Sequence, residues 1–156
     1  MRAPATPKKL SSVRPSLCNC VNVRRASRAI TRIYDKALVP ADLKITQYSV
    51  LANVARSGPL NISKLARILK LDRTTLVRNL KSLEAAAFIE DAAISDPRER
   101  AICITESGRA LVEKAQPYWA LAQKQIEDFL GAEAIQQFNF LVTSLEKLSD
   151  DPDLSE

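Results

Sequence analysis

The segment from 61 to 84 constrains the fold most, because it holds two short helical patterns that each follow a strong N-cap residue. Asn61 precedes the first apolar stripe and Asp72 precedes the second, and both stripes have three- and four-residue spacing. The stripes consist of Ile62, Leu65, Ala66 and Leu69 in the first segment and of Leu76, Leu80, Leu83 and Ala87 in the second. Two short capped helices joined by a brief turn are typical of a helix-turn-helix.

The second of these helices carries a polar and basic face opposite its apolar stripe. Thr74, Arg78 and Lys81 share that face, and further polar side chains lie beside it. Thr and Asn side chains hydrogen-bond to bases or phosphates, and Arg binds guanine with two hydrogen bonds or holds a phosphate. An α-helix fits the major groove of DNA, so this face is predicted to contact it. The competing interpretation is a solvated helix face.

Two short strands are predicted directly after the second helix, from Phe88 to Ala92 and from Ala101 to Ile104. The polar segment 95–100 between them indicates a turn, which makes a β-hairpin with a charged tip. Such a hairpin is a wing, and its two arginines are placed to reach the neighbouring minor groove. The predicted DNA-binding residues are Ser63, Arg73, Thr74, Thr75, Arg78, Asn79, Lys81, Arg98 and Arg100.

Long helical patterns flank this winged segment on both sides. One begins near Pro15 and ends near Leu38, before Pro40, and two more follow Thr105 and are separated by Gly131. Their apolar stripes are too wide for one small lobe to cover, and an apolar surface of that size is usually buried against a partner. We therefore predict a homodimer, with a monomer whose helices fold over the lobe as the alternative. The predicted interface residues are Ile30, Trp119, Phe138, Leu141 and Leu145.

The predicted fold class is mainly α with a small β-hairpin wing, made of a winged helix-turn-helix lobe and a helical dimerisation region. The predicted boundaries are a basic flexible tail at 1–14, the dimerisation region at 15–40 and 105–149, the lobe at 41–104, and an acidic tail at 150–156. Residues 1–100 hold 19 Lys and Arg against 8 Asp and Glu, whereas residues 101–156 hold 4 against 10. A basic front and an acidic rear suggest that one end of the molecule meets a polyanion.

The composition argues against catalysis and against a bound cofactor. The chain has no histidine, which removes His-based acid–base chemistry and most transition-metal sites. Its three glycines are scattered, so no glycine-rich loop is available to hold a phosphate, and its three cysteines do not suggest a disulfide scaffold. We predict a protein that is not an enzyme and that has no metal site. No apolar run could cross a bilayer and no secretion signal is recognisable, so a cytoplasmic protein with no membrane partner is expected.

The motifs resemble those of the multiple-antibiotic-resistance regulator (MarR) family over roughly 17 to 148. The most specific stretches are Asp72-Arg73-Thr74-Thr75-Leu76-Val77-Arg78, Leu83-Glu84, Asp96-Pro97-Arg98-Glu99-Arg100 and Ile104-Thr105-Glu106-Ser107-Gly108, and the pair Pro117 and Trp119 is also similar. The resemblance implies a triangular homodimer that binds a pseudo-palindromic double-stranded DNA operator. It also implies a repressor that responds to a small-molecule effector or an oxidant.

The chain departs from the family pattern at two places. Ala87 stands where the family usually has glycine, so the cap after the recognition helix is altered. Asp91, Ala92 and Ala93 make the wing less basic than is usual. These departures concern how deeply the wing engages DNA and leave the fold expectation unchanged.

Cys20 has two interpretations. Organic-hydroperoxide sensors of the same family carry a reactive cysteine in the first helix, and the resemblance places Cys20 on that position and Tyr34 on one of its tyrosine partners. Ile45 replaces the second tyrosine. Arg24 and Arg28 of the same helix would favour the thiolate. Otherwise Cys18 and Cys20 are small hydrophobic residues at a packed interface.

Two other functions compete with a sequence-specific regulator. An architectural DNA-binding protein without sequence preference would use the same charge and the same groove-sized elements, and would differ only in not preferring one operator by several kcal/mol. A protein–protein adaptor would need an acidic or apolar recognition face, which Arg73, Arg78 and Lys81 contradict.

Overall fold

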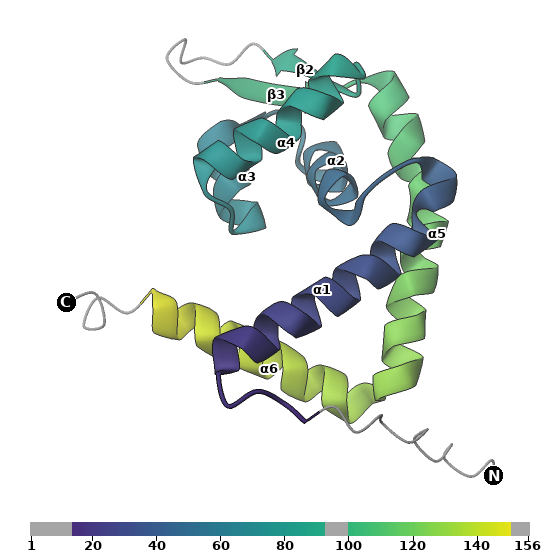
Figure 1. The fold of residues 1–156 in the computed structure, drawn as a ribbon. Helices are drawn as coiled ribbons and strands as arrows, with labels where there is room; N and C mark the ends of the chain where they lie inside the picture. The colour runs from purple at the N-terminus through teal and green to yellow at the C-terminus, as the bar shows by residue number, and fades with distance from the viewer. Residues whose placement is uncertain (1–13, 93–99, 151–156) are drawn as a thin grey trace.

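The computed structural model describes residues 14–92 and 100–150, and this part of the chain forms six α-helices and a three-stranded sheet (Figure 1). The helices are α1 Asn19–Ala37, α2 Ile45–Ser57, α3 Ile62–Leu69, α4 Arg73–Ala85, α5 Glu106–Leu130 and α6 Ala132–Ser149, and a short 3-10 helix, Val39–Ala41, follows α1. The strands are β1 Leu60–Asn61, β2 Ile89–Ala92 and β3 Ala101–Ile104. The predicted fold class, mainly α with a small hairpin wing, is confirmed.

The sheet is antiparallel, with β3 in the middle between β1 and β2. Ile89 pairs with Ile104 and Asp91 with Ile102, so the β2–β3 hairpin is the one that the sequence predicts. Strand β2 begins one residue later than predicted, because the N–H of Phe88 donates instead to the carbonyl of Leu83 at the end of α4. Strand β1 was not predicted, since its two residues are too few to show an alternating pattern.

One apolar core holds the lobe together. Its fully buried side chains come from the C-cap of α1, from α2, α3 and α4, and from β3, and they are Leu38, Val50, Leu51, Val54, Leu65, Leu76, Leu80, Leu83 and Ile102. Ala115 of α5 belongs to the same core. The core therefore extends beyond residue 104, where the predicted lobe ends, and the first half of α5 packs as part of the lobe.

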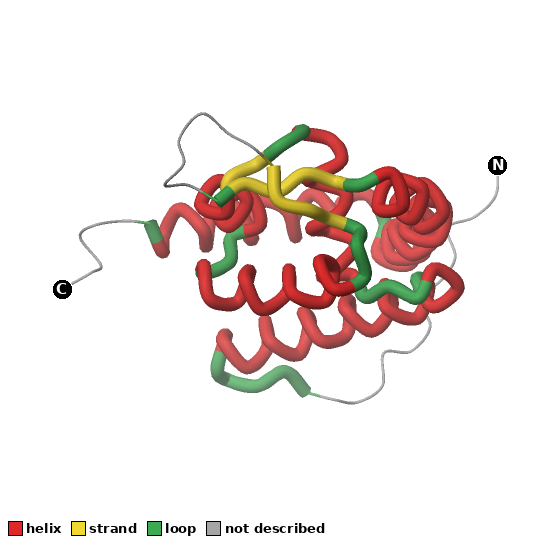
Figure 2. The backbone as a smooth tube through the Cα atoms, turned by 90° about the horizontal axis from the view of Figure 1, so that it is seen from above, coloured by secondary structure: helices red, strands yellow, loops and turns green. Residues whose placement is uncertain are grey.

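The remaining helices extend away from the lobe. In Figure 1 the long helix α5 runs down from the hairpin, and α1 and α6 lie at the far end from the sheet; Figure 2 shows the sheet from above. Gly131, with φ of 80°, ends α5 and allows the chain to turn into α6, as predicted. Helix α1 begins at Asn19, later than the predicted start near Pro15. Neither α1 nor α6 has a buried residue in this single chain.

An aromatic stack lies where α1, α2 and α5 meet. Trp119 of α5 stacks on Tyr34 of α1, with ring centroids 6.5 Å apart, and on Tyr48 of α2, with centroids 6.1 Å apart. The Tyr34 hydroxyl donates to Oε1 of Gln123, and burial raises the pKa of Tyr34. The stack thus connects the helical region to the core of the lobe.

Candidate nucleic-acid interface

The turn between α3 and α4 is fixed by local hydrogen bonds at the positions predicted as caps. Oδ1 of Asn61 accepts from the N–H of Lys64 at 2.7 Å, and Oδ1 of Asp72 accepts from the N–H of Thr75 at 2.8 Å. The hydrogen bonds from Thr75 lower the pKa of the Asp72 carboxyl, so this cap is charged at neutral pH. Lys70 closes α3 in the left-handed conformation, with φ of 51°. Both predicted N-caps are confirmed.

Helix α4 has one face in the core and the opposite face in solvent. Leu76, Leu80 and Leu83 are buried. Among the residues predicted to contact DNA, Arg73, Thr74, Arg78 and Lys81 are exposed on α4, Thr75 and Asn79 are half-buried at the margins of that face, and Ser63 is exposed in the first turn of α3. The structure thus brings seven of the nine predicted residues to the exposed surfaces of two adjacent helices, α3 and α4.

The exposed surface of these two helices is basic. Within the described part of the chain, no salt bridge involves Arg73, Arg78 or Lys81, so their charges are available to a phosphate. Two cations of α3, Lys64 and Arg67, are exposed and were not among the predicted residues. The pattern offered a signal for them, because they flank the buried pair Leu65 and Ala66 and must therefore face outward.

Of the two wing arginines, only Arg100 belongs to the described residues. Arg98 lies outside the described residues, so its position is not assigned. Arg100 lies at the base of the hairpin, where Nη2 is 2.6 Å from Oε1 of Glu84 and Nε is 2.8 Å from Oδ1 of Asp91. The guanidinium of Arg100, which was predicted to contact DNA, is therefore already paired with two carboxylates of this chain.

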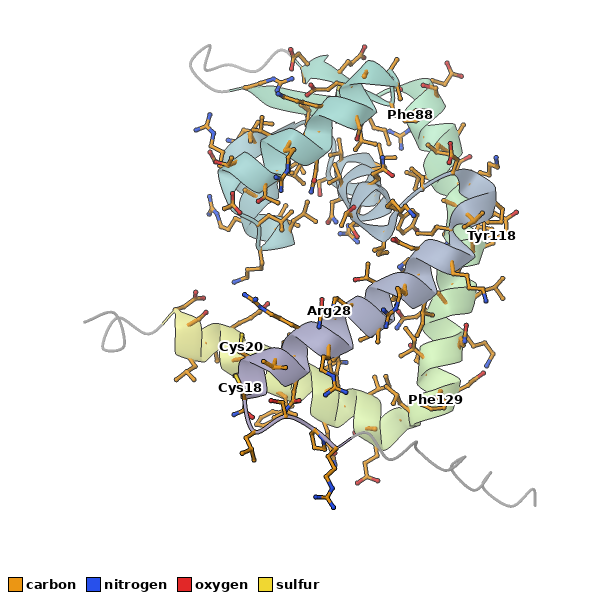
Figure 3. The ribbon with its side chains drawn as sticks, viewed as in Figure 1. Cys18, Cys20, Arg28, Phe88, Tyr118 and Phe129 are labelled. Carbon is orange, nitrogen blue, oxygen red and sulfur yellow. The ribbon has the colours of Figure 1, made fainter. Side chains whose placement is uncertain are left out.

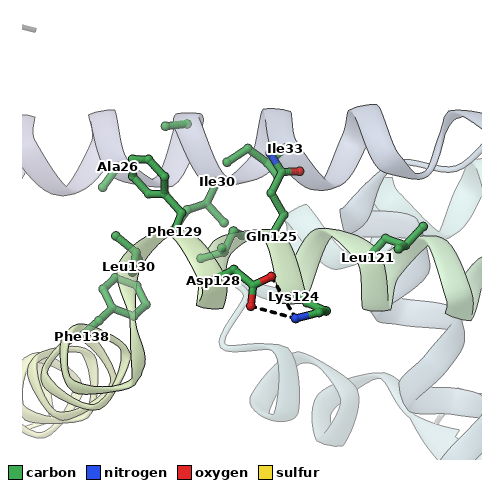
Figure 4. Close-up of a pocket in the computed structure, with 12 residues that line it drawn as sticks. Ala26, Ile30, Ile33, Leu121, Lys124, Gln125, Asp128, Phe129, Leu130 and Phe138 are labelled. Carbon is green, nitrogen blue, oxygen red and sulfur yellow. Dashed lines mark hydrogen bonds and ion pairs between the residues drawn. The ribbon is translucent and has the colours of Figure 1, made fainter. Parts of the chain in front are cut away.

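A groove lies between α1, α5 and α6, on the side of the molecule away from the sheet (Figure 4). Its volume is about 1130 Å³, and Ile30, Phe129 and Phe138 are among the side chains that line it. The predicted interface residues Phe138, Leu141 and Leu145 are 42%, 57% and 53% exposed. Trp119 is half-buried and stacks on Tyr34 within the chain, and its place at the interface stays a prediction. The apolar surface of α6 and of the groove has no covering segment among the described residues.

The three cysteines are unpaired, and two of them lie far from the wing. Figure 3 shows Cys18 and Cys20 at the N-terminal end of α1, and both are exposed. Tyr34 lies fourteen positions along the same helix, about 21 Å away at 1.5 Å per residue, so it does not reach Cys20 within one chain. Cys103 is half-buried on β3, and burial and the nearby Glu90 raise the pKa of its thiol.

Two further features bear on the range of functions. Across residues 14–92 and 100–150, no cluster of three or more Cys, Asp or Glu side chains is arranged to hold a metal ion. No helix in those same ranges combines the length and the apolar character needed to cross a membrane.

Comparisons with known proteins agree with this geometry. A model of the MarR family matches residues 41–98, which span the helix-turn-helix and the start of the wing. The HTH-type transcriptional regulator YhbI of Bacillus subtilis (strain 168) is 30% identical over 129 residues, which cover 80% of this chain and 84% of that protein.

Solved structures show the same architecture. The transcriptional regulator MosR of M. tuberculosis, in complex with DNA, is 33% identical with a TM-score of 0.74, over 84% of this chain and 98% of MosR. A mutant of MarR from E. coli, complexed with operator DNA, has the same fold with a TM-score of 0.74 at 19% identity, over 84% of this chain and 99% of its own.

Proposed function

Because the chain belongs to the MarR family of DNA-binding transcription regulators, we propose that it binds a pseudo-palindromic operator as a homodimer and represses the genes it controls. The observation that carries the proposal is the exposed basic face of α4. Arg73, Arg78 and Lys81 project from a helix whose opposite side is anchored in the core, and no described acidic side chain pairs with them.

The arrangement suits major-groove reading. A helix of 13 residues is short enough to lie in the groove, and its first turns carry Arg73 and Thr74 where base edges and phosphates are reached. Ser63, Lys64 and Arg67 of the preceding helix lie beside it, where phosphate contacts would fix its orientation. The phosphate contacts supply affinity, and the contacts to base edges supply the choice of sequence.

Dimerisation is supported by the surface that a single chain leaves uncovered. Helix α6 has no buried residue, and the groove beside it is lined by Phe129 and Phe138. Soluble proteins rarely expose a continuous apolar surface of this kind. A second copy related by a two-fold axis would cover both surfaces at once and would present two α4 helices to the two halves of an operator.

Regulation by a small molecule or an oxidant is part of the same proposal and rests on the family resemblance. An oxidant response would need the exposed thiol of Cys20, which Tyr34 of the same chain does not reach, so we favour a small molecule over an oxidant as the effector. We propose no catalytic activity, because the surface described above offers binding groups without a nucleophile–base pair. A regulator must share a compartment with the DNA it reads, so we also propose a cytoplasmic location.

Selection of binding sites from random-sequence DNA tests the proposal and separates it from an architectural role. We expect a consensus with two inverted half-sites, bound by about 10³-fold or more in preference to the same duplex with its bases shuffled. An architectural protein would give equal affinity for both duplexes, with the same salt dependence. The affinities for the two duplexes must be measured at one stated salt concentration, because the phosphate contacts by themselves make binding depend steeply on ionic strength.

A further inference from the structure

Arg100 is held by three different elements of the DNA-binding lobe. Its guanidinium contacts Glu84 in the last turn of α4 at 2.6 Å and Asp91 on β2 at 2.8 Å. Its backbone carbonyl accepts the N–H of Ile62, the first residue of α3, at 3.1 Å. One residue therefore links both helices of the helix-turn-helix to the wing.

The charge of Arg100 is matched inside the chain. Hydrogen bonds to Asp91, and to a lesser extent to Glu84, raise the pKa of this guanidinium above its usual value. To bind a phosphate, Arg100 would have to leave these partners and expose two carboxylates beside a polyanion. Arg73, Arg78 and Lys81 have no such competing partners among the described residues.

The position of Arg100 in the hairpin gives this linkage a mechanical role. Asp91 belongs to the last pairs of β2, and Arg100 immediately precedes β3, so the guanidinium joins the two sides of the hairpin at the base of the wing loop. The fork of an arginine holds two carboxylates in a fixed geometry, which the single ammonium of a lysine does not reproduce.

We propose that Arg100 is a positioning residue that fixes the wing against α3 and α4, and that it is not itself a DNA contact. This inference rests on the proposed function and replaces the sequence-based expectation for Arg100. It assigns Glu84 and Asp91 to the same task, although both are acidic groups near a DNA-binding surface.

The substitution Glu84→Gln distinguishes positioning from contact by the sign of its effect. Removing a carboxylate near DNA, and freeing an arginine for phosphate, would tighten binding if Arg100 were a contact. If Arg100 positions the wing, Glu84→Gln loosens it and weakens operator binding by about fivefold, the upper range for an exposed ion pair. Arg100→Ala should weaken binding similarly with an unchanged salt slope, whereas a lost phosphate contact would make the slope shallower by about one.

The variant Arg100→Lys distinguishes a positioning role from a DNA contact in a second way. A lysine preserves a phosphate contact but does not preserve the fork, so we expect it to bind DNA as weakly as Arg100→Ala. The matched control is Glu113→Gln, which makes the same Glu-to-Gln change at an exposed position of α5 that does not line the groove, and should leave affinity within experimental error of the wild type. Tighter binding by Glu84→Gln, or full rescue by Arg100→Lys, would overturn the proposal.

Amide hydrogen exchange without DNA tests the positioning role independently of operator binding. We expect Glu84→Gln and Arg100→Ala to speed exchange at Ile62 and across β3, while the amides of α2 keep the wild-type rate. Unchanged exchange at Ile62 and β3 would refute the proposal. If the variants exchange faster but the wild type shows no sequence preference for DNA, the positioning role of Arg100 stands and the proposed regulator is rejected.

Discussion

The α-carbon of Gly108 packs directly against the backbone carbonyl of Phe88, so that a Cβ atom at position 108 would lie 2.1 Å from that oxygen. The same carbonyl accepts the N–H of Thr105 at 3.1 Å, so it is held in place by the start of α5. Only glycine lets the first turn of α5 approach the start of β2 this closely.

Gly108→Ala should therefore destabilise the lobe. The added methyl group must displace backbone, and overpacking of this kind costs about 1–3 kcal/mol or more. Urea denaturation followed by circular dichroism measures the loss. Arg109→Ala, at the next and exposed position of α5, should change the free energy of unfolding by less than about 0.5 kcal/mol. Equal stability of the two variants would show that the close approach carries no strain.

Ala87→Gly should have the opposite effect. Ala87 is exposed and left-handed, with φ of 55°, a conformation that costs a residue with a Cβ about 1–2 kcal/mol. Glycine removes that cost but gains freedom in the unfolded chain, so we expect a net stabilisation of about 0.5–1 kcal/mol. Ala86→Gly is the matched control, because Ala86 has an ordinary φ of −86° and gains nothing from glycine. A destabilised Ala87→Gly variant would contradict this account of the turn.

Arg78→Ala should weaken operator binding. Arg78 is exposed on α4 without an acidic partner among the described residues, and its loss should cost about 1–3 kcal/mol if it contacts a base edge. Fluorescence anisotropy with the selected operator and with its shuffled duplex separates lost affinity from lost sequence preference. Arg24→Ala removes the same charge from the exposed surface of α1 and should bind like the wild type. Equivalent affinities for both variants would reject α4 as the recognition helix.

Leu141→Asp and Leu145→Asp should produce monomers that remain folded. Both side chains are more than half exposed in one chain, so a carboxylate there does not enter that chain's core, but it would be buried in a dimer at a cost of several kcal/mol. Light scattering after gel filtration gives the mass, and circular dichroism checks the helices. Asn139→Asp adds a charge at another exposed position of α6 that was not predicted to lie in the interface. A wild-type monomer at micromolar concentration would refute the dimer.

Operator binding should be insensitive to organic peroxide. Tyr34, which the resemblance offered as a partner for Cys20, is engaged with Gln123 and lies about 21 Å from Cys20 along α1. Binding measured with and without peroxide, for the wild type, Cys20→Ser and Cys18→Ser, tests this. Release of DNA by the oxidised wild type but not by Cys20→Ser would make Cys20 a sensor.

The helix-turn-helix could be predicted because its signals are local. Asn61, Asp72 and Thr105 each cap a helix through a hydrogen bond to a backbone N–H three residues later, and such a pattern is visible in the sequence. The apolar stripes of α3 and α4 are equally local, since residues three and four apart share a helix face.

The partners of Arg100 could not be predicted in the same way. They lie 9 and 16 positions away in the sequence, and only the pairing of β2 with β3 and the packing of α4 bring them together. The apolar stripe of its helix predicts Trp119 at an intersubunit surface. Such a stripe shows that a side chain is covered, but it does not show whether the same chain or a partner covers it. The stack with Tyr34 and Tyr48 depends on how three helices cross.

That stack also gives the molecule a built-in optical probe. Trp119 is the only tryptophan of the chain, and its two stacking partners lie on α1 and α2, which belong respectively to the helical region and the lobe. Any rearrangement that turns the lobe relative to the helical region must shift the indole against at least one tyrosine ring and change its exposure to water. Emission from Trp119 therefore reports the relative orientation of lobe and helical region without an attached dye, and a titration with DNA or a candidate effector can be followed in the unmodified protein.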